Sequence, residues 1–283
     1  MRNMQILPTA KRGILAALML IGGLIVTANS AEQRPLADGH IHYSHDAWAV
    51  VSAERAVALI RQAGIVMALV SSSPDEGTQR LYRAAPDLVV PVLRPYRKRG
   101  ELGTWVRDLA IIDHVEERLK KNVYAGIGEF HVNGADADLP VVRRMVELAR
   151  QYRIFLHVHS DADAVDRIFK QDPQAVILWA HAGFEPYAVV HAMMKKHKNL
   201  RADLSFRSEY FSGGELDPQW LAMFTEFPDR FVLGTDTYTP SRWSSVGEHA
   251  EWSQAWIAAL PAEIADRIAL DNVRELVEWA LKK

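Results

Sequence analysis

Cysteine is absent from this sequence of 283 residues. The chain therefore forms no disulfide bond, offers no thiolate ligand to a metal ion and has no cysteine nucleophile. An N-terminal cysteine that carries a lipid anchor is excluded for the same reason. An oxidising compartment would impose no disulfide chemistry on this protein.

Acidic residues are absent from the first thirty positions, which differ from the rest of the chain. Arg2, Lys11 and Arg12 form a basic start, residues 13–27 are apolar, and the small residues at 28–30 end in Ser30. This order is typical of a secretory signal peptide, and we expect it to span residues 1–30 with cleavage after Ser30. The apolar run of fifteen residues is shorter than the ~18 to 20 residues of a spanning helix, so a retained anchor is less favoured. We expect a periplasmic or secreted protein whose mature chain has no membrane span.

An excess of positive charge is also absent. The chain has 33 basic and 35 acidic residues, and three of the basic ones fall in the predicted signal peptide, which leaves 30 minus 35, or −5, for the mature chain. A general nucleic-acid-binding surface is not indicated. We expect a small molecule as the partner of this protein.

Short β-branched runs alternate with longer segments of helical period through most of the chain, which predicts successive β/α units with a parallel sheet. We expect strands at 35–42, 65–71, 88–93, 123–129, 154–159, 175–180, 200–204 and 231–234. The first of these is poor by propensity because it contains Pro35, Asp38 and Gly39.

Residues 31–283, which remain after the predicted signal peptide, match the ~250 residues typical of one β/α barrel. An open doubly wound sheet would show similar alternation. We favour the closed barrel because eight units fill the length and no glycine-rich nucleotide loop follows the first strand. The predicted fold is α/β, a single-domain (β/α)8 TIM barrel of parallel strands.

Residues that bind metals fall at the carboxyl ends of the predicted strands, which is the end where such barrels build their sites. His40 and His42 are two apart on one strand, so both point to the same side. Four more candidates end the fourth, fifth, sixth and eighth strands; they are Glu129, His159, His181 and Asp236.

Imidazole and carboxylate groups together suit a divalent cation. We expect one or two ions per chain, zinc first, with manganese or iron as alternatives. A single His-x-His pair or a lone histidine at a strand end would be weak evidence, since most such histidines are packed or exposed residues. The prediction depends on the six candidates occurring together.

Several motifs resemble those of the amidohydrolase superfamily, within it the amidohydrolase-related TIM-barrel metal-dependent hydrolases. The resemblance covers nearly all of the mature chain. Its motifs are Asp38-Gly39-His40-Ile41-His42, Gly128-Glu129, His159-Ser160, Ala180-His181-Ala182-Gly183, Ala202-Asp203-Leu204-Ser205, Gly234-Thr235-Asp236 and Asn272.

The resemblance implies roles for the six candidates. His40, His42 and Asp236 would bind the more buried metal, and His159 with His181 the more exposed one. Glu129 would bridge the two ions, as a glutamate or a carboxylated lysine does in the binuclear members. In mononuclear members the histidine of the sixth strand is catalytic instead, so that His181 would be a catalytic group and Glu129 no ligand. Both arrangements remain open.

Other residues are expected near the mouth of the barrel. Arg94 and Arg207 follow predicted strands, where each would either bind a substrate carboxylate or phosphate or pair with a nearby acid. Tyr43 is a candidate for the wall of a substrate site. His157 is expected to pack behind His159, and His131 to lie in a loop after its strand.

The predicted function is hydrolysis of a small ester, lactone, amide or phosphoester by a water molecule that a metal ion activates. Asp236 is the predicted general base. Two alternatives remain: a mononuclear decarboxylase of the same superfamily, and a non-catalytic barrel that binds a metal ion or ligand.

Overall fold

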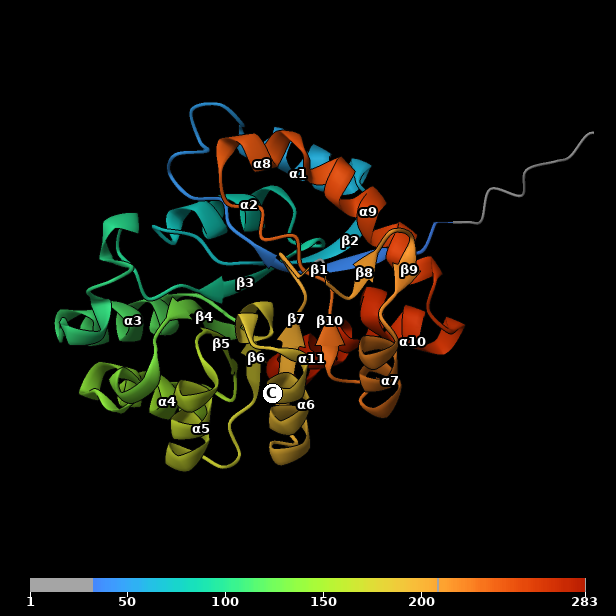
Figure 1. Ribbon diagram of the computed structural model, residues 1–283. Helices are drawn as coiled ribbons and strands as arrows, with labels where there is room; N and C mark the ends of the chain where they lie inside the picture. Colours follow the sequence, from blue (N-terminus) through green and yellow to red (C-terminus); the bar gives the residue numbers. More distant parts are fainter. Residues whose placement is uncertain (1–32, 208, 283) are drawn as a thin grey trace, which may run out of the picture. The chain divides into compact units, whose positions relative to one another are not determined.

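Eight parallel strands form the centre of the molecule (Figure 1). The structure is a computed structural model and describes residues 33–207 and 209–282. The strands pair in chain order and are β1 Leu36–Ile41, β2 Ile65–Val70, β3 Val89–Leu93, β4 Gly126–His131, β5 Phe155–His159, β6 Ile177–Trp179, β7 Leu200–Asp203 and β10 Phe231–Val232. The predicted (β/α)8 fold is confirmed, whereas the predicted signal peptide lies outside the described residues.

The sheet closes between β1 and the segment that follows β10. Ile41 pairs with Thr237 in parallel register. The amide of Gly39 donates to the carbonyl of Leu233 over 2.8 Å, and the amide of His42 donates to the carbonyl of Thr237 over 2.8 Å. A Cβ at position 39 would lie 3.0 Å from the Leu233 oxygen, so the residue with the poorest strand propensity is the one that this close approach requires.

Helices alternate with the strands, as the sequence pattern predicts. Their bounds are α1 Ala53–Gln62, α2 Glu76–Ala84, α3 Ala110–Lys121, α4 Pro140–Tyr152, α5 Ala162–Gln171, α6 Tyr187–Lys196, α7 Pro218–Glu226, α8 Pro240–Ser244, α9 Val246–Ala258, α10 Ala262–Asp266 and α11 Asn272–Leu281. A short antiparallel hairpin, β8 Phe211–Ser212 and β9 Glu215–Leu216, was not expected from the sequence. Each long helix turns an apolar face toward the strands; α4, for example, buries Val142 and Met145.

The last helix fills the amino-terminal end of the barrel. Val273, Leu276 and Ala280 of α11 belong to one buried cluster with inward-facing strand residues such as Ala37 and Leu178. Asn272, the first residue of this helix, donates from its side-chain nitrogen to the carbonyls of Pro228 and Phe231, each over 2.8 Å. One end of the barrel is thus a packed core, and the other end is left for polar groups.

No helix among residues 33–207 and 209–282 has the length and the apolar character needed to cross a bilayer.

Candidate metal centre

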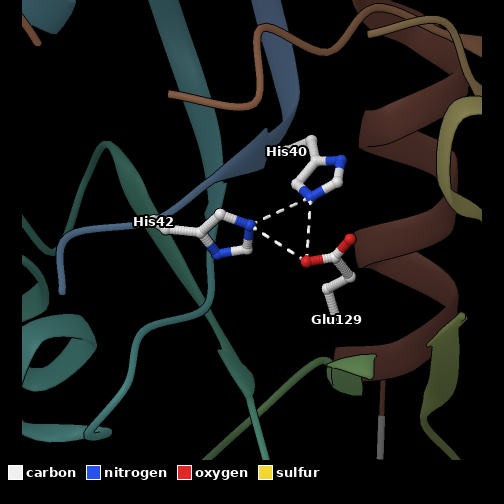
Figure 2. Close-up of side chains that lie close together, drawn as sticks. All are labelled: His40, His42 and Glu129. Carbon is white, nitrogen blue, oxygen red and sulfur yellow. Dashed lines mark hydrogen bonds and ion pairs between the residues drawn. The ribbon is translucent and has the colours of Figure 1, made fainter. Parts of the chain in front are cut away.

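The six predicted ligands converge at the carboxyl end of the barrel. The imidazoles of His40 and His42 approach each other with 3.0 Å between their Nε2 atoms. Glu129 Oε2 lies 3.5 Å from the first Nε2 and 3.2 Å from the second. Figure 2 shows the three side chains pointing toward one another, the two imidazoles from the end of β1 and the carboxylate from β4.

Asp236 lies in the segment after β10 and completes this group from the other side of the closure between β1 and that segment. Its Oδ1 atom lies 3.2 Å from His42 Nε2 and 3.6 Å from His40 Nε2. Four donors around a tetrahedral zinc ion with bonds of 2.0–2.1 Å are about 3.3 Å apart. The five separations that involve the two imidazoles, 3.0 to 3.6 Å, are close to that value, so these residues fit a divalent cation.

The second oxygen of Glu129 faces a different set of imidazoles. Glu129 Oε1 lies 2.8 Å from His159 Nδ1, 3.8 Å from His181 Nε2 and 3.9 Å from His131 Nε2. These separations are less regular than those around Oε2. His131, which the sequence placed in a loop, is the last residue of β4. Glu129 therefore stands between two groups of ligand atoms.

Hydrogen bonds behind the imidazoles orient their ring nitrogens. His42 Nδ1 bonds to the carbonyl of Ser71, and His181 Nδ1 lies 3.0 Å from the carbonyl of Ser205. His40 Nδ1 lies 3.1 Å from Asp203 Oδ2. Because each Nδ1 faces an oxygen acceptor, it carries a proton, and in the neutral imidazole that binds a metal ion Nε2 presents its lone pair to the cavity.

Asp203, the last residue of β7, is a functional residue for which the sequence analysis assigned no role. It is fully buried. Its Oδ2 atom also lies 3.1 Å from His157 Nε2, and its Oδ1 atom accepts from the amides of His181 and Ser205 over 3.2 and 3.1 Å. Its position at the carboxyl end of a predicted strand, like that of the other candidates, was the available signal.

The backbone is left-handed at two of the candidate ligands. His181 has φ 55° and Asp236 has φ 45°, and such a conformation in a residue other than glycine costs on the order of 1 kcal/mol or more. Arg207 donates to the carbonyls of His181 and Glu185 over 3.0 and 2.8 Å. Arg242 Nε donates to the carbonyl of Asp236 over 2.9 Å. Two buried or half-buried guanidinium groups thus hold the strained turns.

The buried charges perturb one another strongly. Burial alone would lower the pKa of His40, but the carboxylates of Asp236, Asp203 and Glu129 raise it well above its usual value. Burial alone would raise the pKa of Asp236, but the neighbouring imidazoles of His40 and His42 lower it to about 2. The pKa of Glu129 is likewise held well below its usual range, against its burial, by His40 and Arg94. The carboxylates are therefore anionic and suited to balance a cation.

A cavity of about 300 Å³ opens above the ligands. Its floor includes His42, Glu129 and Asp236. Phe184 and Phe206, which are 53% and 48% exposed, form apolar parts of its wall. The size and the mixture of apolar and polar walls are those of a site for a small molecule.

The structure brings only one of the three predicted substrate-binding residues to this cavity. Arg94 lines it. Arg207 is committed to backbone carbonyls, as described above, and is not among the residues that line it. Tyr43 is buried, and its hydroxyl donates to the carbonyl of Val51 over 2.6 Å, so it packs beneath the mouth.

Several wall residues were not identified from the sequence. Phe184, Phe206, Leu102, Tyr96 and Arg99 line the cavity, and all of them come from loops after strands. The residue types carry no signal by themselves, because loop conformation decides which side chains face the cavity.

We predict that Asp203→Asn weakens metal binding by about 10- to 100-fold. An amide places an NH2 group against either the two imidazole donors or the two backbone amides that the carboxylate accepts. Equilibrium dialysis against zinc, with metal analysis, measures the change. Asp172→Asn is the control, because Asp172 is a buried carboxylate that accepts from Gln174 between α5 and β6, away from these ligands. Equal affinities in both variants and the wild type would contradict this role of Asp203.

Comparisons with known proteins agree with this geometry. The fold is similar to that of a TatD homologue, YJJV, from Escherichia coli K12, with TM-score 0.59 and 14% identity over 86% of this chain and 97% of that chain. A TIM-barrel protein from Bordetella bronchiseptica aligns with TM-score 0.56 and 15% identity over 80% and 83% of the two chains. A beta-aspartyl dipeptidase from Fervidobacterium islandicum aligns with TM-score 0.52 and 13% identity over 86% and 72%. At these identities the likeness concerns the fold.

A search of curated proteins gave no match. The family model described as amidohydrolase matches residues 37–279. This range contains all six candidate ligands and all eight barrel strands, apart from the first residue of β1. With the convergent imidazoles and carboxylates, this match shows that the chain belongs to the amidohydrolase family and has a site compatible with a divalent metal ion.

Proposed function

We propose that this protein hydrolyses a small ester, lactone, amide or phosphoester in a metal-dependent reaction. The observation that supports this proposal is that Nε2 of His40 and Nε2 of His42 lie 3.0 to 3.6 Å from each other and from carboxylate oxygens of Glu129 and Asp236, at the floor of a cavity. The family to which the chain belongs and the geometry of the site both support metal-dependent hydrolysis as the class of reaction.

These donors suit zinc first and manganese or iron as alternatives. When bound, such a cation lowers the pKa of water to about 7 and polarises the oxygen of the bond to be cleaved. His40 and His42 hold it through Nε2, with the carboxylates of Asp236 and Glu129 completing the set. His159 and His181 lie on the other side of Glu129, where a second ion or the substrate would bind.

Asp236 is the general base in this proposal. Its side chain is 11% exposed and borders the cavity, so its Oδ2 atom is accessible to a water molecule. The carboxylate accepts a proton from the attacking water and transfers it to the leaving group. His181 is the second catalytic group in this proposal. Its Nε2 atom lies 3.9 Å from Asp236 Oδ2, so it would bind a second ion or the substrate oxygen next to the general base.

The walls of the cavity restrict the substrate. A volume of about 300 Å³ accommodates a small molecule. Phe184 and Phe206 favour an apolar portion next to the reacting bond. Arg99 lines the cavity and pairs with Asp46, so it offers a partly neutralised cationic group.

A mononuclear decarboxylase is the second candidate. The observation that favours it is the ion pair between Arg94 Nη2 and Glu129 Oε2, over 2.7 Å, because Glu129 then has a partner other than a second ion. Release of carbon dioxide from a carboxylic acid, without hydrolysis, would select this candidate. Retained metal without turnover would select a non-catalytic barrel.

We further propose that the protein acts in the periplasm or outside the cell. The support is the basic, apolar and small-residue order of residues 1–30. Expression of the full chain in a bacterial host should give a periplasmic protein that begins with Ala31. A cytoplasmic protein that retains Met1 would contradict export and would leave the proposed reaction untouched.

Removal of the metal should abolish hydrolysis. The purified protein is stripped with a chelator and assayed on a panel of p-nitrophenyl esters, lactones, amides and phosphoesters. We expect activity to fall by at least about 100-fold, because the metal ion supplies several kcal/mol of transition-state stabilisation. Readdition of zinc, manganese or iron should restore it. Activity that survives complete removal of metal would refute the proposal.

The Asp236→Asn variant should retain most of its metal and lose activity. An amide oxygen still fills the position of Oδ1, but the group no longer accepts a proton, so we expect kcat to fall by about 10²- to 10⁴-fold. Metal content and kcat are measured on the same preparation. A variant with normal metal content and normal kcat would show that another group is the base.

A further inference from the structure

Arg94 is fixed against the carboxylate at the centre of the site. Its Nη2 atom lies 2.7 Å from Glu129 Oε2, and its Nε atom donates to the carbonyl of Glu129 over 3.1 Å. The side chain is 9% exposed, and its guanidinium carbon lies 5.0 Å from the centre of the Tyr96 ring. Contacts on two edges and one face leave this guanidinium group little freedom.

The oxygen that Arg94 contacts is the one that belongs to the regular set of donors. Glu129 Oε2 lies 3.2 Å from His42 Nε2 and 3.5 Å from His40 Nε2. A carboxylate oxygen has two lone pairs, so it accepts from the guanidinium and still binds one cation. The hydrogen bond from the Arg94 guanidinium, however, reduces the negative charge of the Glu129 carboxylate, which is the group that would have to bridge two ions.

The charges around the imidazoles balance one divalent ion. Three carboxylates contact these rings, those of Glu129, Asp236 and Asp203. Among residues 33–207 and 209–282, Arg94 is the one arginine or lysine whose side chain forms an ion pair with any of these three carboxylates. With the imidazoles neutral, as ligands of a metal ion are, the sum of −3 and +1 is −2, which one divalent cation neutralises. A second divalent ion would leave a net positive charge in a buried site, which is unfavourable.

We propose that Arg94 acts as a fixed cation of the centre and limits it to one divalent ion, held by His40, His42, Asp236 and Glu129 Oε2. The inference rests on the proposed metal-dependent function and specifies its stoichiometry. His159 and His181, on the Oε1 side of Glu129, are then free to contact the substrate. The bridging role that the family resemblance implies for Glu129 does not apply in this case.

The test measures metal stoichiometry in two matched variants. Arg94→Gln keeps a hydrogen-bond donor near Glu129 and removes the charge, whereas Arg94→Lys keeps the charge. The metal-free proteins are dialysed against a series of free zinc concentrations and analysed for bound zinc. We expect one ion per chain in the wild type and in Arg94→Lys. In Arg94→Gln we expect a second ion whose affinity is at least about tenfold higher than in the wild type.

Arg99→Gln is the control for a general change of charge. Arg99 lines the same cavity, but it pairs with Asp46 and not with a candidate ligand, so its replacement should leave the stoichiometry at one. Thermal melting of the metal-free variants checks that each one is folded. If Arg94→Gln is unfolded, Arg94→Met, which also removes the charge and keeps a long side chain, replaces it in the same measurement.

Two results would overturn the inference. The first is a wild-type protein that binds two zinc ions with similar affinity. The second is a folded Arg94→Gln variant whose second-ion affinity equals that of the wild type. Neither result bears on hydrolysis: an active protein with two ions refutes the role of Arg94 alone, and a one-ion protein without any hydrolysis refutes the proposed reaction alone.

Discussion

Closure of the sheet between β1 and the segment after β10 is the constraint on which the whole site depends. The two backbone bonds across this seam, from Gly39 to Leu233 and from His42 to Thr237, place the His-x-His pair of β1 against Asp236. These residues are nearly two hundred positions apart in the chain. An open sheet with the same strands would leave them at opposite edges, and no shared cation site would exist.

The closed barrel also accounts for the division between its two ends. At the amino-terminal end, α11 packs against inward-facing apolar residues, so that end contributes stability. At the carboxyl end, imidazoles and carboxylates are removed from water, which is costly unless each polar atom has a partner. Asp203 accepts from five donors there, and Arg207 and Arg242 hold the strained turns. Rigidity behind the ligands is thus obtained with hydrogen bonds from residues outside the proposed ligand set.

The electrostatic arrangement links the metal centre to the substrate cavity. Glu129 connects the regular donor set on one oxygen to His159, His181 and His131 on the other, and Arg94 fixes its charge from the side. In the site that we propose, the same carboxylate determines how many cations are accepted and which imidazoles remain for substrate. The apolar residues Phe184 and Phe206 form part of the cavity wall above it.

The sequence by itself determined the fold class and the identity of the residues that converge. Alternating strand and helix patterns are local, and the position of a histidine at a strand end follows from them, so the meeting of His40, His42, Glu129, His159, His181 and Asp236 was predictable. Only the tertiary structure decided what surrounds these groups. Asp203 behind His40, Arg94 on Glu129, and the withdrawal of Arg207 and Tyr43 from the cavity depend on loop conformations and on contacts between distant strands, which no local pattern encodes.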